Sequence, residues 1–229
     1  VCLCTIKEKF SLDYLSKSKN LLRHKKGEDG FKNLCDLNDW YFEIVEDFLT
    51  EEECDKIINL TKDKLTDSYV NSTGKEKSVL NKDIRTSKLY WAGRNEDPLF
   101  EKISKKVSDK LDIPQENQEK IQIIHYKPNG FYKKHYDSCD IKNDNCIEQH
   151  ERIGKRTITA FIYLNDIEKG GETSFNNIGV KVKPKKGMAV FWNNLDINKN
   201  RNYCSLHEAQ PPISGDKWAL TVWSRTKKQ

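Results

Sequence analysis

The stretch IQIIHYKPNGFYKKHYD, residues 121–137, contains the pattern that decides the fold. Its first six residues are mostly β-branched or aromatic, and a Pro-Asn-Gly sequence then marks a turn. The stretch therefore predicts a strand over residues 121–126, a turn, and an extended segment that ends in His-Tyr-Asp at positions 135–137.

His135 and Asp137 form a candidate metal-binding pair. Side chains alternate faces along an extended strand, so these two point the same way while Tyr136 points away. Together with the distant His207 they supply two imidazoles and one carboxylate. This ligand set holds iron(II) on one face and leaves the opposite positions open for a co-substrate and dioxygen. Such triples also arise by chance, so the surrounding residues must support the assignment.

The last predicted strand carries a lysine ten residues after His207. Lys217, Ala219, Thr221 and Trp223 share one face of this strand, and the other face is apolar. A small anionic molecule could lie over the two small side chains with its carboxylate on the Lys217 ammonium. The alternative is a lysine that ends an edge strand in solvent, since lysines are mostly exposed.

Composition is that of a water-soluble protein without a charged surface specialised for nucleic acid. The 229 residues are 36% hydrophobic and 33% charged, with 40 basic and 35 acidic residues giving a net charge of +5. The charges are interleaved, which favours a solvated surface over a nucleic-acid patch. No apolar run is long enough to span a membrane. The chain begins at Val1, which leaves open a preceding anchor or signal segment.

Seven cysteines, an odd number without a C-x-x-C motif, argue against a structural zinc module. Cys139 and Cys146 flank a polar loop, and Cys204 precedes His207 closely. A disulfide among these three and free thiols both remain open, depending on the redox compartment.

The chain divides into a peripheral segment and a domain. Residues 1–38 are expected to be a linker or peripheral segment, and residues 39–229 the domain. A strand is expected near residues 40–45, followed by a helix whose capping box is Thr50 with Glu53. A second helix opens with Asp97-Pro98 and runs to residue 111. Residues 66–82, polar and glycine-containing, are expected to form a mobile loop.

The remainder of the chain predicts strands. They are β-branched, rich in aromatic residues and bounded by turn sequences, over residues 121–126, 157–164, 180–183, 188–192 and 218–224. Helices followed by a run of strands indicate an α+β domain whose β part is a sandwich or jelly roll.

Several short motifs follow one another over residues 40–226, and their order and spacing form a recognisable series. They are Tyr126, His135-Tyr136-Asp137, Arg156-Thr157-Ile158-Thr159, Gly170-Gly171-Glu172-Thr173, Pro184-Lys185-Lys186-Gly187, His207, Pro211, Gly215 and Lys217-Trp218. This series resembles the catalytic domain of prolyl 4-hydroxylases, which are iron(II)- and 2-oxoglutarate-dependent dioxygenases. The polar insertion at residues 138–154 is most similar to viral and small soluble members.

The resemblance implies a double-stranded β-helix (jelly-roll) core with flanking N-terminal helices. It implies Fe(2+) bound by His135, Asp137 and His207, with 2-oxoglutarate and O2 as co-substrates and ascorbate as reductant. The distal carboxylate of 2-oxoglutarate would bind Lys217, helped by Tyr126 and Thr173. The residues implied in the peptide groove are Arg85, Tyr132, Arg156 and Trp223; the less favoured alternative is that the two aromatic residues are ordinary core residues.

The implied partner is a proline-containing peptide or protein, collagen-like or Pro-rich, rather than nucleic acid. A cellular member would work in the endoplasmic reticulum lumen, and a viral one in the host cell or virion. One departure is Glu208, where relatives usually carry a small residue. It could place a negative charge near the site.

Two other functions stay open at this stage. One is another 2-oxoglutarate oxygenase, acting on a different side chain or on a nucleic-acid base; the nucleic-acid branch usually anchors its co-substrate with arginine rather than with a lysine such as Lys217. The other is a jelly-roll binding module without catalysis. The complete set of implied metal ligands argues against such a module.

Overall fold

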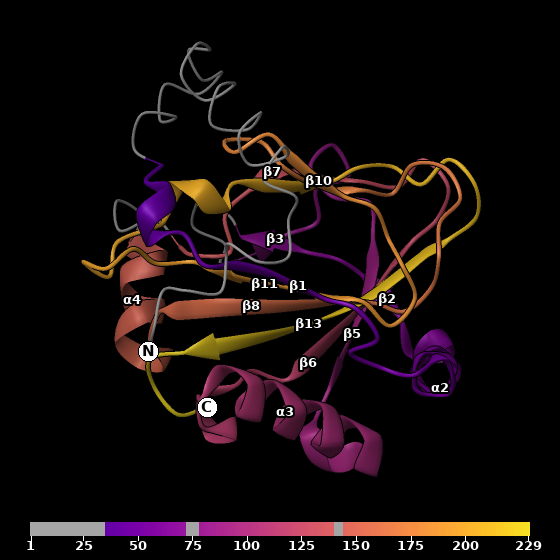
Figure 1. Ribbon diagram of the computed structural model, residues 1–229, viewed down its shortest axis with the longest axis horizontal. Helices are drawn as coiled ribbons and strands as arrows, with labels where there is room; N and C mark the ends of the chain where they lie inside the picture. Colours follow the sequence, from indigo (N-terminus) through magenta and orange to yellow (C-terminus); the bar gives the residue numbers. More distant parts are fainter. Residues whose placement is uncertain (1–34, 72–77, 140–143) are drawn as a thin grey trace.

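The computed structural model describes residues 35–71, 78–139 and 144–229 (Figure 1). A seven-stranded antiparallel sheet has the order β1 (Phe42–Val45), β11 (Ala189–Asn193), β8 (Arg156–Tyr163), β13 (Lys217–Arg225), β6 (Ile121–Tyr126), β5 (Lys88–Ala92) and β2 (Thr66–Asp67). A four-stranded sheet has the order β10 (Val180–Val182), β9 (Thr173–Phe175), β12 (His207–Ala209) and β7 (Tyr132–His135). The two stacked sheets confirm the jelly-roll prediction.

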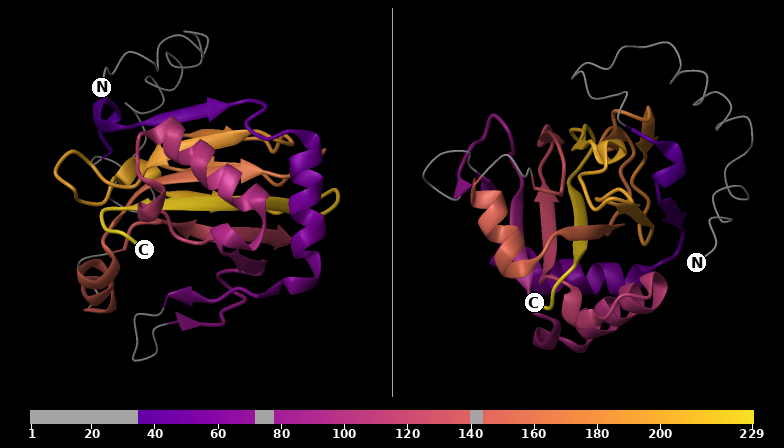
Figure 2. Two further views of the ribbon diagram at one scale, coloured as in Figure 1. Left: turned by 90° about the horizontal axis from the view of Figure 1, so that it is seen from below. Right: turned by 90° about the vertical axis from the view of Figure 1, so that its left-hand side faces the viewer.

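Two helices cover the outer face of the large sheet (Figure 2). They are α2 (Glu51–Thr61) and α3 (Pro98–Leu111), and their apolar sides pack onto the large sheet in one buried cluster. Their N-termini are as predicted. Thr50 and Glu53 form a complete capping box, and Asp97 accepts a hydrogen bond from the Leu99 amide at 2.8 Å.

A second apolar cluster fills the space between the sheets. It is rich in aromatic rings, and Phe175 and Trp192 meet edge to face with ring centroids 5.1 Å apart. The short connecting 3-10 helices are η3 (Leu37–Asp39), η4 (Lys62–Lys64), η5 (Arg94–Glu96), η6 (Gln115–Asn117) and η7 (Tyr203–Ser205). Among the described residues, no helix is long and apolar enough to cross a membrane.

Some elements were not predicted from the sequence. The expected mobile loop over residues 66–82 contains β2 and a small hairpin of β3 (Val70–Asn71) and β4 (Ser78–Val79), while residues 72–77 lie outside the described residues. The polar insertion contains α4 (Asp144–Ile153). The prediction that residues 66–82 are loop throughout was wrong at β2, β3 and β4, because strands of two residues are too short for a recognisable alternation.

The described part of the chain contains two disulfides. Cys139 pairs with Cys146, as one of the open alternatives allowed, and Cys204 pairs with Cys35, which the sequence did not suggest. Cys54 is a buried free thiol. The expected peripheral segment lies mostly outside the described residues, but its residues 35–38 are included, and Cys35 ties them to the domain.

We expect Cys35→Ser to lower the free energy of unfolding by about 2–5 kcal/mol under oxidising conditions. The bond joins residues 169 positions apart, so it removes much of the conformational freedom of the unfolded chain. Denaturant unfolding measures the loss. Cys139→Ser is the matched control and should cost less, because its loop spans only 7 positions. Equal losses in the two variants would contradict the prediction.

Candidate active site

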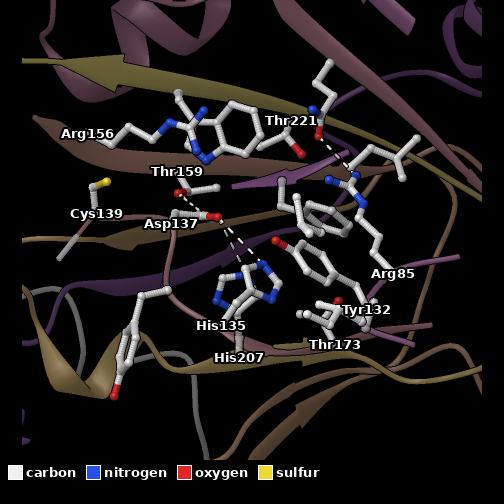
Figure 3. A pocket seen from close by; sticks show the side chains of 18 of the residues that line it. Arg85, Tyr132, His135, Asp137, Cys139, Arg156, Thr159, Thr173, His207 and Thr221 are labelled. Atoms are coloured by element: carbon white, nitrogen blue, oxygen red, sulfur yellow. Dashed lines mark hydrogen bonds and ion pairs between the residues drawn. The ribbon is translucent and has the colours of Figure 1, made fainter. Parts of the chain in front are cut away.

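Three side chains able to hold a metal ion meet between the two sheets. His135 ends β7 and His207 begins β12, and the two residues are paired directly across the β7–β12 ladder. Asp137 follows β7, and its Oδ1 atom lies 3.8 Å from Nε2 of His135 and 3.9 Å from Nε2 of His207 (Figure 3). One ligand atom from each residue lies within 4.8 Å of the other two. The pair predicted from strand alternation and the distant histidine therefore converge.

Hydrogen bonds turn these ligand atoms toward a common point. Nδ1 of each histidine donates to the carbonyl oxygen two residues earlier in the chain, at 2.8 Å. Since a carbonyl can only accept, each Nε2 is the unprotonated nitrogen when the ring is neutral. Oδ2 of Asp137 accepts from the Thr159 hydroxyl at 2.7 Å, which leaves Oδ1 for a metal.

The electrostatics of the site favour deprotonated ligands. Burial and then the neighbouring His207 imidazole lower the pKa of His135 to about 3. Burial raises the pKa of Asp137, but the two imidazoles and the Arg156 guanidinium outweigh it, so this pKa lies below its usual value. His135 and Asp137 are therefore in the form that a metal ion requires.

A cavity of about 370 Å³ opens onto the three ligands. Its wall includes the side chains implied for the co-substrate and the peptide, with one exception; Figure 3 labels Arg85, Tyr132, Arg156 and Thr173 among them. They are Arg85, Tyr126, Tyr132, Arg156, Thr173 and Trp223. The exception is Lys217.

Lys217 lies behind the cavity wall. It is fully buried on the central strand β13, so the alternative of a solvent-exposed edge lysine is wrong. Its Nζ has no hydrogen-bond partner and lies 5.4–5.7 Å from the ring centroids of Tyr126, Phe161 and Tyr163. Burial lowers the pKa of Lys217 to about 7. An unpaired ammonium at this depth is costly unless an anion joins it.

One wall of the cavity is a stack of three side chains. The Arg85 guanidinium lies 4.6 Å from the centroid of the Tyr132 ring, which in turn stacks on the His135 imidazole at 3.6 Å. Nε of Arg85 donates to the Ser87 hydroxyl at 2.7 Å. The cation and the aromatic ring are thus fixed directly above a candidate metal ligand.

The other side is built on a buried ion-pair cluster. Arg156 lies 3.8 Å above the Trp223 ring and donates twice to Glu119, at 2.5 and 2.8 Å. Glu119 also accepts from Arg225 at 2.7 Å. The neighbouring Trp223 side chain also helps to lower the pKa of Asp137. The cluster therefore holds a flat aromatic surface beside Asp137 on the cavity wall.

Comparison with known proteins assigns the family. Residues 121–225 match the model of the 2OG-Fe(II) oxygenase superfamily. A "Putative prolyl 4-hydroxylase" of Acanthamoeba polyphaga mimivirus is 34% identical over 186 residues, covering 81% of this chain and 74% of that protein. The chain belongs to the prolyl 4-hydroxylase family of 2OG-Fe(II) oxygenases. It is an iron(II)- and 2-oxoglutarate-dependent dioxygenase.

Two further similarities support the same family. Prolyl 4-hydroxylase 2 of Arabidopsis thaliana is 32% identical over 201 residues, which cover 79% of this chain and 65% of that protein. The chain thus spans slightly less than two thirds of this plant relative. The crystal structure of a viral collagen prolyl hydroxylase from Paramecium bursaria Chlorella virus-1, in complex with 2OG, superposes with a TM-score of 0.64 at 30% identity. The match covers 81% of this chain and 96% of that one.

The side chains of this site fit both iron(II) and 2-oxoglutarate. Two free Nε2 atoms and one free carboxylate oxygen form the donor set expected for iron(II), with one side left open. The unpartnered Lys217 ammonium supplies the charge that a 2-oxoglutarate carboxylate needs. The hydroxyl of Thr173, which accepts from Tyr163 at 2.7 Å, lies on the cavity wall.

Sequence reasoning missed the residues that orient the aspartate. Asn194 donates to Thr159 at 2.8 Å, and Thr159 donates to Asp137. Thr159 was noted only as part of a motif. It shares the inner face of β8 with Phe161 and Tyr163 by alternation, but only the paired sheets show that this face meets Asp137.

Glu208 does not place charge in the site of the dioxygenase. Alternation along β12 turns it away from His207, and its carboxylate accepts from the Asn176 side chain at 3.1 Å. The expectation that this departure puts a negative charge near the metal ligands is therefore wrong.

Proposed function

We propose that this dioxygenase hydroxylates prolyl residues in peptides or proteins, coupled to oxidative decarboxylation of 2-oxoglutarate to succinate. The observation that carries the proposal is that two arginine–aromatic stacks, Arg85–Tyr132 and Arg156–Trp223, line the cavity of the candidate metal ligands, and that Tyr132 stacks on His135. The similarity to prolyl 4-hydroxylases of viruses and plants supports the same substrate class.

In this proposal His135, Asp137 and His207 hold iron(II), which supplies the oxidising power that an unactivated carbon requires. The protein fixes the geometry. The backbone carbonyls that accept from each Nδ1 set the imidazole orientation, and Thr159 orients the carboxylate. The surrounding aromatic cluster keeps bulk water away from the reacting centre.

Lys217 binds the distal carboxylate of 2-oxoglutarate in this scheme, with Tyr126 and Thr173 on the adjoining cavity wall. The attraction is electrostatic, because Lys217 is a buried cation without a hydrogen-bond partner and the co-substrate is an anion. Tyr126 is one of the residues that line the cavity. It is buried, and its hydroxyl lies near Arg85 and Ser87.

The proposal predicts that 2-oxoglutarate binds more weakly above pH 7. The pKa of Lys217 is lowered to about 7 without an anion and must rise once a carboxylate pairs with it. Binding above pH 7 therefore takes up a proton, and the dissociation constant should rise up to about tenfold per pH unit. Calorimetric titration between about pH 6 and pH 9 measures the slope. In Lys217→Arg the guanidinium does not titrate, so a slope that persisted there would assign it to another group.

The peptide is proposed to lie between the Arg85–Tyr132 stack and the Arg156–Trp223 stack. A Pro-rich or collagen-like segment suits such a groove, because its polyproline II form is already ordered and docks on aromatic surfaces with little entropy loss. The β3–β4 hairpin supplies Val70 to the same cavity wall, and loops of this kind complete a site over bound substrate.

Truncating Tyr132 or Trp223 to alanine should reduce peptide hydroxylation by about tenfold or more, since each removes a central aromatic contact. Uncoupled decarboxylation of 2-oxoglutarate needs no peptide and should change much less. Both activities are measured in one preparation of each variant. If they fall together, the two residues support the metal site or the core, and the groove assignment fails.

A further inference from the structure

Trp91 is an aromatic residue of the catalytic cavity that the proposed peptide groove does not yet use. It lies on β5, where its neighbours Tyr90 and Ala92 belong to the apolar cluster under the helices. Alternation therefore turns Trp91 to the inner face of the large sheet, and it lines the cavity together with Trp223. The centroids of the two indole rings lie 5.8 Å apart, so Trp91 continues the aromatic wall that Trp223 begins.

The Trp91 side chain is available to a ligand. It is 37% exposed, whereas the Trp223 side chain beside it is only 6% exposed. Tyr69 and Ile84 are exposed as well and line the same cavity. Exposed apolar side chains that continue a binding cavity are typical of a surface that receives an apolar group of a ligand.

Gln122 adds a polar group next to Trp91. It lies directly opposite Trp91 across the β5–β6 ladder, lines the cavity and is 3% exposed. Its Oε1 accepts from the Arg85 guanidinium at 3.5 Å. Since a guanidinium can only donate, the amide nitrogen of Gln122 is the atom left over, and it donates to no group in the described part of the chain. Buried donors normally have a partner, so this amide has room for one from the substrate.

A proline-rich peptide matches both features. A polyproline II segment has no internal hydrogen bonds, so its carbonyl oxygens need outside donors, and its proline rings pack on aromatic faces. The segment advances about 3.1 Å per residue, so two rings 5.8 Å apart would contact side chains about two residues apart. Trp223 lies at the metal end of this wall, beside Asp137. Trp91 is therefore placed for a residue that flanks the target.

We propose that Trp91 and Gln122 form a subsite for a second proline of the substrate, about two residues from the target proline. The Trp91 indole contacts the second proline ring, and the Gln122 amide donates to a carbonyl oxygen of the peptide between the two prolines. This rests on the proposed function, since the second proline belongs to the same peptide. The subsite selects Pro-rich segments over a single proline in another sequence context.

The test uses an alanine-based peptide with one target proline and a Pro, Leu or Ala moved through the flanking positions. Fragment mass spectrometry counts oxygen on the target proline alone. At a position about two residues away, Pro should give about tenfold higher kcat/KM than Ala, and Leu should give no such gain.

Trp91→Ala should remove this advantage, so that the Pro and Ala peptides react alike, and Trp91→Phe should keep most of it. The matched control is Tyr90→Ala, which truncates an aromatic residue of the same strand on its other face and should keep the wild-type preference. A ratio of kcat/KM between two peptides does not depend on the fraction of folded protein, so partial misfolding cannot imitate the result.

Gln122→Glu separates the two contacts of Gln122. The glutamate keeps an acceptor for Arg85 but, when ionised, has no hydrogen-bond donor. It should lower kcat/KM for the two-proline peptide by about tenfold while uncoupled decarboxylation of 2-oxoglutarate persists. Wild-type hydroxylation in this variant would mean that Gln122 only orients Arg85, and would overturn its part in the subsite.

Each outcome with the peptides decides the matter. Equal hydroxylation of the one-proline and two-proline peptides, or a preference that Trp91→Ala leaves unchanged, overturns the subsite and leaves the proposed function standing. A Leu peptide as good as the Pro peptide means a general apolar pocket and also overturns it. If no peptide is hydroxylated while 2-oxoglutarate is still consumed, the prolyl substrate itself is wrong and the subsite fails with it.

Discussion

Replacing His135 with alanine is expected to abolish both peptide hydroxylation and uncoupled decarboxylation, with Asp137→Ala giving the same result. Each change leaves two ligands for the metal, and removal even of residues that merely orient ligands costs about 10–100-fold in metal affinity or activity. The fold should persist, because these side chains lie at the end of β7 and outside the two apolar clusters. Thermal unfolding and metal titration are measured beside activity.

The matched control is His150→Ala, which removes a histidine of α4 that does not line the cavity. It should retain activity and metal affinity. Wild-type turnover in His135→Ala with iron supplied would exclude this residue as a ligand. A loss of activity with unchanged metal affinity would give His135 a role other than coordination.

Lys217→Met is expected to give a protein that is more stable and nearly inactive. Loss of the charge-assisted partner should weaken 2-oxoglutarate binding by about 1.5–3 kcal/mol, roughly ten- to a hundredfold. Lys217→Arg should also bind more weakly, because the planar fork is bulkier than the ammonium. An unchanged apparent affinity for 2-oxoglutarate in Lys217→Met would rule out this anchoring role.

The gain in stability follows from the burial of an unpaired cation. Methionine is apolar and flexible enough to fill the same space, so the free energy of unfolding without co-substrate should rise by about 1–4 kcal/mol. The pKa of Lys217 is lower in the fold, about 7, than its ordinary 10.5. The unfolded chain therefore holds the extra proton between these values, and wild-type stability rises with pH across this window.

The difference between variant and wild type should accordingly be largest at about pH 6 and shrink as the pH rises through 7 toward 10. Denaturant unfolding at several pH values measures it. A Lys217→Met protein that is less stable than wild type at pH 6 would mean that the ammonium has a stabilising partner in the fold.

Local sequence patterns predicted the features that depend only on residues close together in the chain, such as helix starts and the direction of neighbouring side chains. The capping box at Thr50 and the helix start at Asp97 follow from side chains within three residues. The common direction of His135 and Asp137 follows from strand alternation alone. The convergence of His207 on this pair rested on the family resemblance, and the β7–β12 pairing provides it.

The features that were missed depend on pairing between distant segments. Thr159 orients Asp137 only because β8 lies across the cavity from β7, and Cys35 meets Cys204 across most of the chain. The β3–β4 hairpin consists of two-residue strands, which leave no periodic signal. Glu208 was expected near the site because the sequence did not show that residues 207–209 form a strand, in which neighbouring side chains point to opposite faces.

Prolyl hydroxylation coupled to 2-oxoglutarate turnover is tested most directly by measuring succinate and peptide oxidation together in one reaction. Wild-type protein, iron(II), ascorbate and 2-oxoglutarate are incubated with a Pro-rich peptide, and with the same peptide carrying alanine at the target proline. The first peptide is expected to gain one oxygen atom on proline for each succinate formed, and the second to gain none. Succinate formed without an oxygen on any proline, or oxygen on another residue of both peptides, would contradict it.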